Sequence, residues 1–123
     1  MFNGRKLVCL CGSTKFKEAF EEANRTETLK GNIVLTVAMF GHLEGLDMNS
    51  EDKKIFDMVH LDKILLADEI LVLNVNGYIG ESTKKEITYA IENHKRIVFL
   101  ETMSLPFKDL KFNSISEEVG NGK

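Results

Sequence analysis

The stretch Glu69–Ala90, EILVLNVNGYIGESTKKEITYA, joins an apolar run, a glycine-containing loop and a polar helix start. The apolar run reaches Val75 and stops at Asn76-Gly77, a pair typical of a turn. Ser82-Thr83 then opens a helical segment that carries Glu86 one turn in. A strand, a glycine loop and a helix N-terminus in this order can present a carboxylate and free backbone N–H groups to a small anionic ligand. The stretch therefore predicts an α/β fold and a candidate site.

Outward from this stretch, apolar runs and helical periodicities alternate along the chain. The patterns predict strands at 6–11, 32–37, 69–75 and 96–100, and helices at 14–29, 50–67 and 83–93. Alternating strands and helices indicate a parallel sheet with helices on both faces. We expect an α/β fold: a single three-layer, flavodoxin/Rossmann-like domain with four to five strands, in the order 2-1-3-4 with an optional fifth. The second helix is expected to turn its apolar residues toward the core, namely Ile55, Met58, Val59, Leu65 and Leu66.

Length and charge restrict the class of protein. The 123 residues suit one domain, which we place at 1–112, followed by a flexible tail at 113–123. A net charge of −3 provides no basic surface for a nucleic acid polymer, and no apolar run approaches the ~18 residues of a membrane span. Neither kind of partner is expected.

The two cysteines, Cys9 and Cys11, are two residues apart and should lie on one face of the first strand. They are too close in sequence for an ordinary disulfide, so reduced core thiols in a cytoplasmic protein are expected. The three histidines are scattered along the chain, and no metal site is predicted.

Ligands of open parallel sheets bind beyond the carboxyl ends of the strands, at the point where the strand order reverses. Two loops should meet there, and they contain the candidate phosphate-binding residues Gly12, Ser13, Thr14, Gly80, Glu81 and Ser82. The long loop after the second strand could close over the crevice as a lid, with Met39, Phe40 and His42. The alternative for Gly12-Ser13-Thr14 is a plain helix cap after a tight turn.

Glu86 has two interpretations. Thr83 and Glu86 fit a capping box, in which the glutamate folds back on the backbone N–H of the cap residue. Alternatively, Glu86 lies at the floor of the crevice as a nucleophile or general base, with Glu81 as a competing carboxylate. His60 and Asp62 on the second helix are further catalytic candidates, whereas Asp68 should be structural, at the opposite end of the sheet.

Three segments of the chain resemble the nucleoside 2-deoxyribosyltransferase-like superfamily, which includes 2′-deoxynucleoside 5′-phosphate N-hydrolases. The segments are Leu10–Thr14 (LCGST), Ala67–Ile70 (ADEI) and Glu86–Ala90 (EITYA), and the likeness spans about residues 7–100. The chain is most similar to a branch of small proteins with a G-Y-I-G-E-S-T loop. The resemblance implies that Glu86 attacks C1′ of a deoxyribosyl group, and that Gly12, Ser13 and Ser82 hold a 5′-phosphate.

The chain also departs from this family's pattern. Cys9 stands where family enzymes often have a tyrosine, and His60 stands at the position of an acid, with Asp62 two residues further on. Two functions follow: an enzyme that cleaves or transfers the N-glycosidic bond of a 2′-deoxynucleoside or its 5′-phosphate, or a nucleotide-binding module without turnover. No cofactor is expected, since the phosphate loop is short for a flavin and tryptophan is absent. The family resemblance also implies a homo-oligomer, a dimer or larger.

Overall fold

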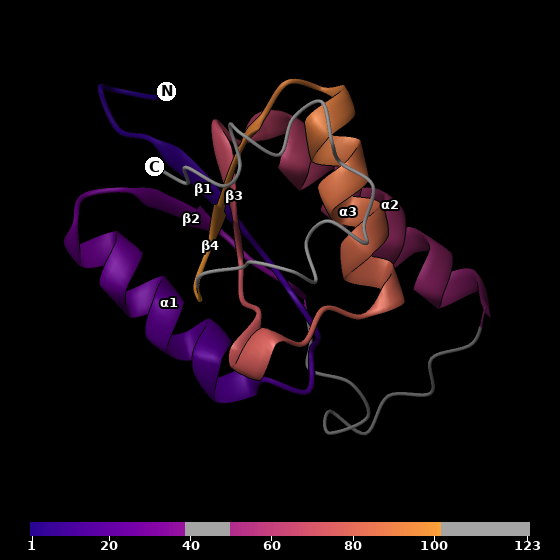
Figure 1. Ribbon diagram of the computed structural model, residues 1–123. Coiled ribbons are helices and arrows are strands. Elements are labelled where there is room, and N and C mark those ends of the chain that lie inside the picture. Colours follow the sequence, from indigo (N-terminus) through magenta and orange to yellow (C-terminus); the bar gives the residue numbers. More distant parts are fainter. Residues whose placement is uncertain (39–49, 102–123) are drawn as a thin grey trace.

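The computed structural model describes residues 1–38 and 50–101 (Figure 1). Four strands in these ranges form one sheet in the order β2-β1-β3-β4, with every pairing parallel. They are β1 (Leu7–Cys11), β2 (Ile33–Leu35), β3 (Glu69–Val72) and β4 (Arg96–Phe99), and the helices are α1 (Lys17–Leu29), α2 (Ser50–Leu66) and α3 (Glu81–Glu92). The predicted α/β class and strand order are confirmed. The optional fifth strand, the tail at 113–123 and the lid residues Met39, Phe40 and His42 fall outside the described residues.

Three layers build the domain, with α1 on one face of the sheet and α2 and α3 on the other (Figure 1). Side chains of a strand alternate between faces, so Val8 and Leu10 pack in the cluster that contains Phe20 of α1. Cys9 and Cys11 point to the opposite face and are buried with residues of α2 and α3. The prediction that both thiols share one face is confirmed.

Strand β3 ends at Val72, three residues earlier than predicted, because buried Asn74 turns the chain. Its side-chain amide donates to the carbonyl oxygen of Glu101 at 2.9 Å, and its Oδ1 accepts from the Glu101 N–H at 2.9 Å. A short 3-10 turn, η2 (Val75–Gly77), follows, with Asn76 at φ 55°. The chain thereby turns toward α3 at the carboxyl end of the sheet.

Other element boundaries also differ from the prediction. Helix α1 begins at Lys17 instead of Thr14, because the N–H of Phe16 donates to the carbonyl oxygen of Ser13 and closes a turn first. Strand β2 is confined to Ile33–Leu35, and α3 begins at Glu81, two residues earlier than predicted.

The predicted core face of α2 is wrong. Its buried side chains are His60 and Ile64, followed by Ala67 just beyond the helix, a spacing of four and then three residues that follows one helical stripe. The five apolar residues expected in the core are exposed instead: Ile55, Met58, Val59, Leu65 and Leu66. Apolar residues occur all round this helix, so its sequence does not determine which side faces the sheet. Packing on the sheet decides which side is buried.

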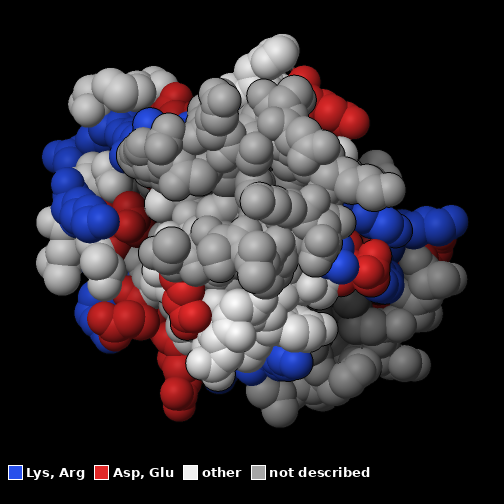
Figure 2. Space-filling view, viewed as in Figure 1, with Lys and Arg blue, Asp and Glu red and all other residues white. Residues whose placement is uncertain are grey.

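Charged residues on the outer surface are mixed in sign. In the view of Figure 2, acidic and basic side chains of the described residues intermingle along the margins and form no single basic field. No helix in the described ranges is long and apolar enough to cross a membrane.

Candidate functional site

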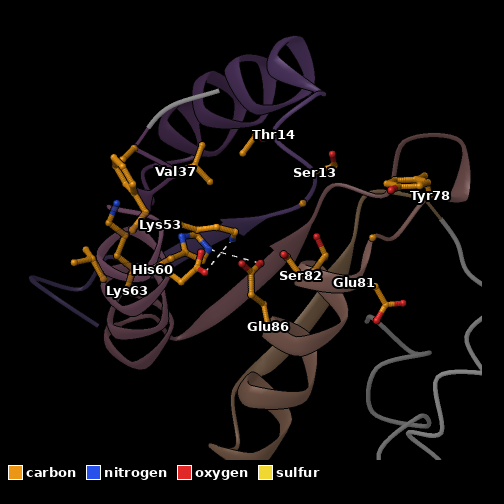
Figure 3. A pocket seen from close by; sticks show the side chains of 17 residues that line it. Ser13, Thr14, Val37, Lys53, His60, Lys63, Tyr78, Glu81, Ser82 and Glu86 are labelled. Atoms are coloured by element: carbon orange, nitrogen blue, oxygen red, sulfur yellow. Dashed lines mark hydrogen bonds and ion pairs between the residues drawn. The ribbon is translucent and has the colours of Figure 1, made fainter. Parts of the chain in front are cut away.

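A pocket of about 530 Å³ opens beyond the carboxyl ends of the strands (Figure 3). The loop after β1, helix α2 and the segment leading into α3 supply most of its wall, as strand order 2-1-3-4 requires. Its lining residues are Gly12, Ser13, Thr14, Val37, Ala38, Lys53, Phe56, Asp57, Val59, His60, Lys63, Tyr78, Gly80, Glu81, Ser82, Thr83 and Glu86. The six predicted phosphate-binding residues therefore share one cavity with Glu86 and His60.

The loop after β1 passes close to the backbone beyond β3. A Cβ atom at Gly12 would lie 3.2 Å from the Cβ and 3.3 Å from the carbonyl oxygen of Leu73, so the close approach requires glycine. Beyond it, the Oγ of Ser13 accepts from the N–H of Lys15 at 3.4 Å. This loop is positioned by contacts between β1 and β3 rather than by a helix cap.

Glu86 turns into the pocket, and the predicted capping box does not form. Gly80 is the N-cap residue of α3, and no side chain caps that end of the helix. The Oε1 of Glu86 lies 3.8 Å from the Nε2 of His60, on the opposite wall (Figure 3). Glu81 lines the rim, but its side chain is 84% exposed and pairs with Lys84, against 21% exposure for Glu86. Of the two competing carboxylates, Glu86 is the one in the cavity.

His60 connects the pocket to the two cysteines. Its Nε2 lies 3.6 Å from the Sγ of Cys11 and 3.9 Å from the Sγ of Cys9, and all three residues are buried. The sequence interpretation kept this histidine apart from the thiols, because it lies about 50 residues further along the chain. The Nδ1 of His60 and the Oε1 of Glu86 are buried and have no hydrogen-bond partner in the described structure.

Burial controls the ionisation of this group of residues. Desolvation raises the pKa of Glu86 to about 7, although the charge of His60 opposes the shift. Burial lowers the pKa of His60, but the hydrogen bond and negative charge of Cys9, together with the charge of Glu86, outweigh it and the pKa rises. Hydrogen bonding with Cys11 lowers the pKa of Cys9 to about 6, and the same contact raises that of Cys11. Titratable groups that face one another across a buried contact are typical of functional sites.

One predicted catalytic residue, Asp62, lies outside the pocket, and an acid that was not predicted lies inside it. Asp62 is exposed on α2 and does not line the pocket, because the helix turns His60 inward instead. Asp57, one turn before His60, is the acid of α2 that reaches the cavity, where it pairs with Lys53 at 3.1 Å. Asp57 lies one helical turn before His60, so it could have been suggested if the side of α2 that faces the pocket had been known.

Tyr78 is a further lining residue that sequence reasoning did not assign. Its ring meets Phe16 edge to face with the centroids 5.9 Å apart, and the Nζ of Lys15 lies 3.8 Å from its centroid. Gly80 is small enough to leave room for this ring, since a Cβ there would lie 3.2 Å from the Tyr78 hydroxyl oxygen. The result is an aromatic rim beside the loop formed by Gly12, Ser13 and Thr14.

A scan against models of protein families found no match to this chain, and a search of curated proteins also found none.

Proposed function

We propose that this pocket binds a 2′-deoxynucleoside or its 5′-phosphate and that Glu86 cleaves or transfers the N-glycosidic bond. The observation that carries the proposal is that Glu86, on α3, and Ser13, in the loop after β1, line the same cavity. A carboxylate that faces a glycine-rich phosphate-side loop across a pocket can reach the C1′ of a sugar whose 5′ end is held by that loop. The resemblance to the deoxyribosyltransferase-like superfamily supports the same roles.

The reaction has two steps, as in a retaining glycosidase. An oxygen of Glu86 attacks C1′, the bond from C1′ to the base nitrogen breaks, and its electron pair leaves with the base. Water, or a second base, then attacks C1′ and releases Glu86, so no oxidant or reductant is needed. Because the pKa of Glu86 is about 7, about half of the carboxylate is ionised and nucleophilic at neutral pH.

The departing base must gain a proton. A water molecule in the pocket can donate it, and Asp57, the α2 acid that lines the pocket and is paired with Lys53, is placed to orient that water. His60 is less suited to the base, since its Nε2 faces Glu86 and the thiols. In this proposal His60 positions Glu86, and Asp57 is a positioning residue in place of the catalytic role considered for His60 or Asp62.

The direct test is release of free base from a panel of deoxynucleosides and their 5′-phosphates, followed by chromatography. We expect release by the wild type and a loss of about 10³-fold or more in Glu86→Ala, since a covalent nucleophile cannot be replaced by water alone. Glu92→Ala is the matched control: it removes an exposed carboxylate from the other end of the same helix, outside the pocket lining, and should retain activity. Equal activity of wild type and Glu86→Ala would contradict the proposal.

A second reading is a nucleotide-binding module without turnover. It is favoured by the buried thiol of Cys9 on β1, which stands where enzymes of the similar family often have a tyrosine. Tight binding of a deoxynucleotide with no base release by either protein would support this module over the enzyme.

We also infer that the chain forms a homo-oligomer through α2. Five large apolar side chains are exposed on and at the end of this helix, a surface that a second copy would cover: Ile55, Met58, Val59, Leu65 and Leu66. Sedimentation equilibrium should give a dimer or larger species for the wild type, and a shift toward monomer for Met58→Glu. A monomeric wild type would contradict the inference.

A further inference from the structure

We propose that Cys9, Cys11 and His60 form a binding site for a thiophilic divalent cation, with Zn²⁺ as the expected ion. The sequence alone predicted no metal site, because the histidines are far from the cysteines along the chain. The fold brings two sulfur atoms and one imidazole nitrogen within 4.8 Å of one another. Two thiolates and one imidazole are a ligand set that zinc accepts, with a fourth position left for water or another group.

The distances agree with a tetrahedral ion. Zinc–sulfur bonds of about 2.3 Å and zinc–nitrogen bonds of about 2.0–2.1 Å put sulfur and nitrogen roughly 3.5 Å apart at tetrahedral angles. The observed separations are 3.6 Å from Cys11 and 3.9 Å from Cys9 to the Nε2 of His60. Both nitrogen–sulfur separations therefore lie within a few tenths of an ångström of the tetrahedral value.

The surroundings also suit an ion of this class. The Oε1 of Glu86 is buried 3.8 Å from the same nitrogen and has no hydrogen-bond partner in the described structure. It is a nearby oxygen that could accept a hydrogen bond from a water molecule in the fourth position. His60 and Glu86 line the pocket, and the buried thiols lie on the far side of the His60 Nε2, at 3.6 and 3.9 Å from it.

Charge is balanced when the ion binds. Both cysteines bind as thiolates and His60 binds as the neutral imidazole, so the protons that these groups still hold pass to solvent, and the Zn²⁺ bis-thiolate centre is neutral before Glu86 is counted. An uncompensated cation at this depth would be costly, and the paired thiolates remove that cost. The ion would also tie β1 to α2, because the thiols lie on the strand and the imidazole on the helix.

The test uses the full chain, stripped of metal with a chelator and kept reduced by a phosphine. Titration with Co²⁺ should produce a thiolate-to-cobalt charge-transfer band and the strong visible bands of a tetrahedral site, both lost when Zn²⁺ is added. Zinc analysis after gel filtration should find about one ion per chain, and Zn²⁺ should raise the melting temperature. The absence of the charge-transfer band at saturating Co²⁺ would overturn the proposal.

Variants identify the ligands. We expect His60→Asn to weaken binding by about tenfold or more, in line with the effects seen when metal shells are altered. His94→Asn is the matched control, because it changes an exposed histidine whose positive φ of 61° asparagine tolerates. The double variant Cys9→Ala/Cys11→Ala should lose the band, and an unchanged band in that variant would contradict the site.

A second measurement avoids any dependence on folded variants. X-ray absorption at the zinc edge of the wild-type protein should show two sulfur neighbours at about 2.3 Å together with nitrogen or oxygen at about 2.0 Å. A shell of oxygen and nitrogen alone would refute the thiolate ligands. None of these measurements uses glycosyl chemistry, so the metal site and the proposed reaction can fail independently.

Discussion

Carboxylates have opposite surroundings at the two edges of the sheet, the amino edge where the strands begin and the carboxyl edge where they end. At the amino edge, Asp68 accepts hydrogen bonds from the N–H of Leu7 at 2.8 Å and from the terminal ammonium of Met1 at 3.0 Å. Nearby, Glu69 is buried but lies 3.3 Å from the Nζ of Lys6. At the carboxyl edge, Glu86 is partly buried, and its buried Oε1 has no hydrogen-bond partner in the described ranges.

This difference affects how each carboxylate contributes to stability. Hydrogen bonds lower the pKa of Asp68, so its ionised form contributes to the free energy of unfolding at neutral pH. Desolvation raises the pKa of Glu86, so Glu86 costs stability when it ionises. The comparison therefore predicts opposite effects of pH and of substitution at the two edges.

The largest effect is expected for Glu86→Gln in metal-free protein. Because the folded pKa of about 7 lies above the unfolded value of 4.5, the wild type loses stability as pH rises between these values. The raised pKa of His60 acts in the same sense. The lowered pKa of Cys9 acts in the opposite sense in both proteins, so the quantity to compare is their difference: between pH 5 and pH 8 the wild type should lose roughly 1 to 3 kcal/mol relative to Glu86→Gln. Denaturant titrations across this range measure both, and parallel profiles for the two proteins would break the comparison.

Glu69→Gln at the amino edge should lower the free energy of unfolding, whereas Glu86→Gln should raise it relative to the wild type at neutral pH. The Oε1 of Glu69 lies 3.3 Å from Lys6 and 3.6 Å from Arg96, and the glutamate side chain is only 8% exposed. Its removal should cost about 1 kcal/mol, because both cations are half-exposed and can be solvated. Glu22→Gln, at an exposed ion pair with Arg25 in α1, is the control and should stay within about 0.5 kcal/mol. Stabilisation by Glu69→Gln at pH 7 would contradict the assignment of this edge.

Asp68→Asn should give the smallest effect and a distinct pH dependence. Hydrogen bonds from Leu7 and the amino terminus lower the pKa of Asp68, so its contribution is present above the ordinary aspartate value and is lost as pH falls below it. The side chain is a third exposed, which keeps the contribution small. Wild type and variant should therefore converge in stability in strong acid, and a gap that widens there would count against the prediction.

The candidate site was predicted in its parts, but not in its arrangement. Gly12-Ser13-Thr14 and residues 76–82 could be placed together from the alternating pattern alone, because the carboxyl ends of parallel strands meet at one edge. The role of Glu86 could not be decided, since Thr83 and Glu86 have the spacing of both a capping box and a pocket carboxylate. The start of α3 at Glu81 removed the cap, and a start at Lys84, three residues later, would have kept it available.

The sequence by itself determined the α/β class, the strand order and the edge of the sheet at which a ligand would bind, because these depend on local periodicity and on the handedness of crossovers. Only the tertiary structure decided which side of α2 faces the sheet, since apolar residues occur all round this helix. That choice buries His60 against Cys9 and Cys11, leaves Met58 exposed, and brings Asp57 rather than Asp62 into the pocket. Contacts between residues about 50 positions apart have no local signature, so the group that joins the thiols, the imidazole and Glu86 emerges only when the helix packs on the sheet.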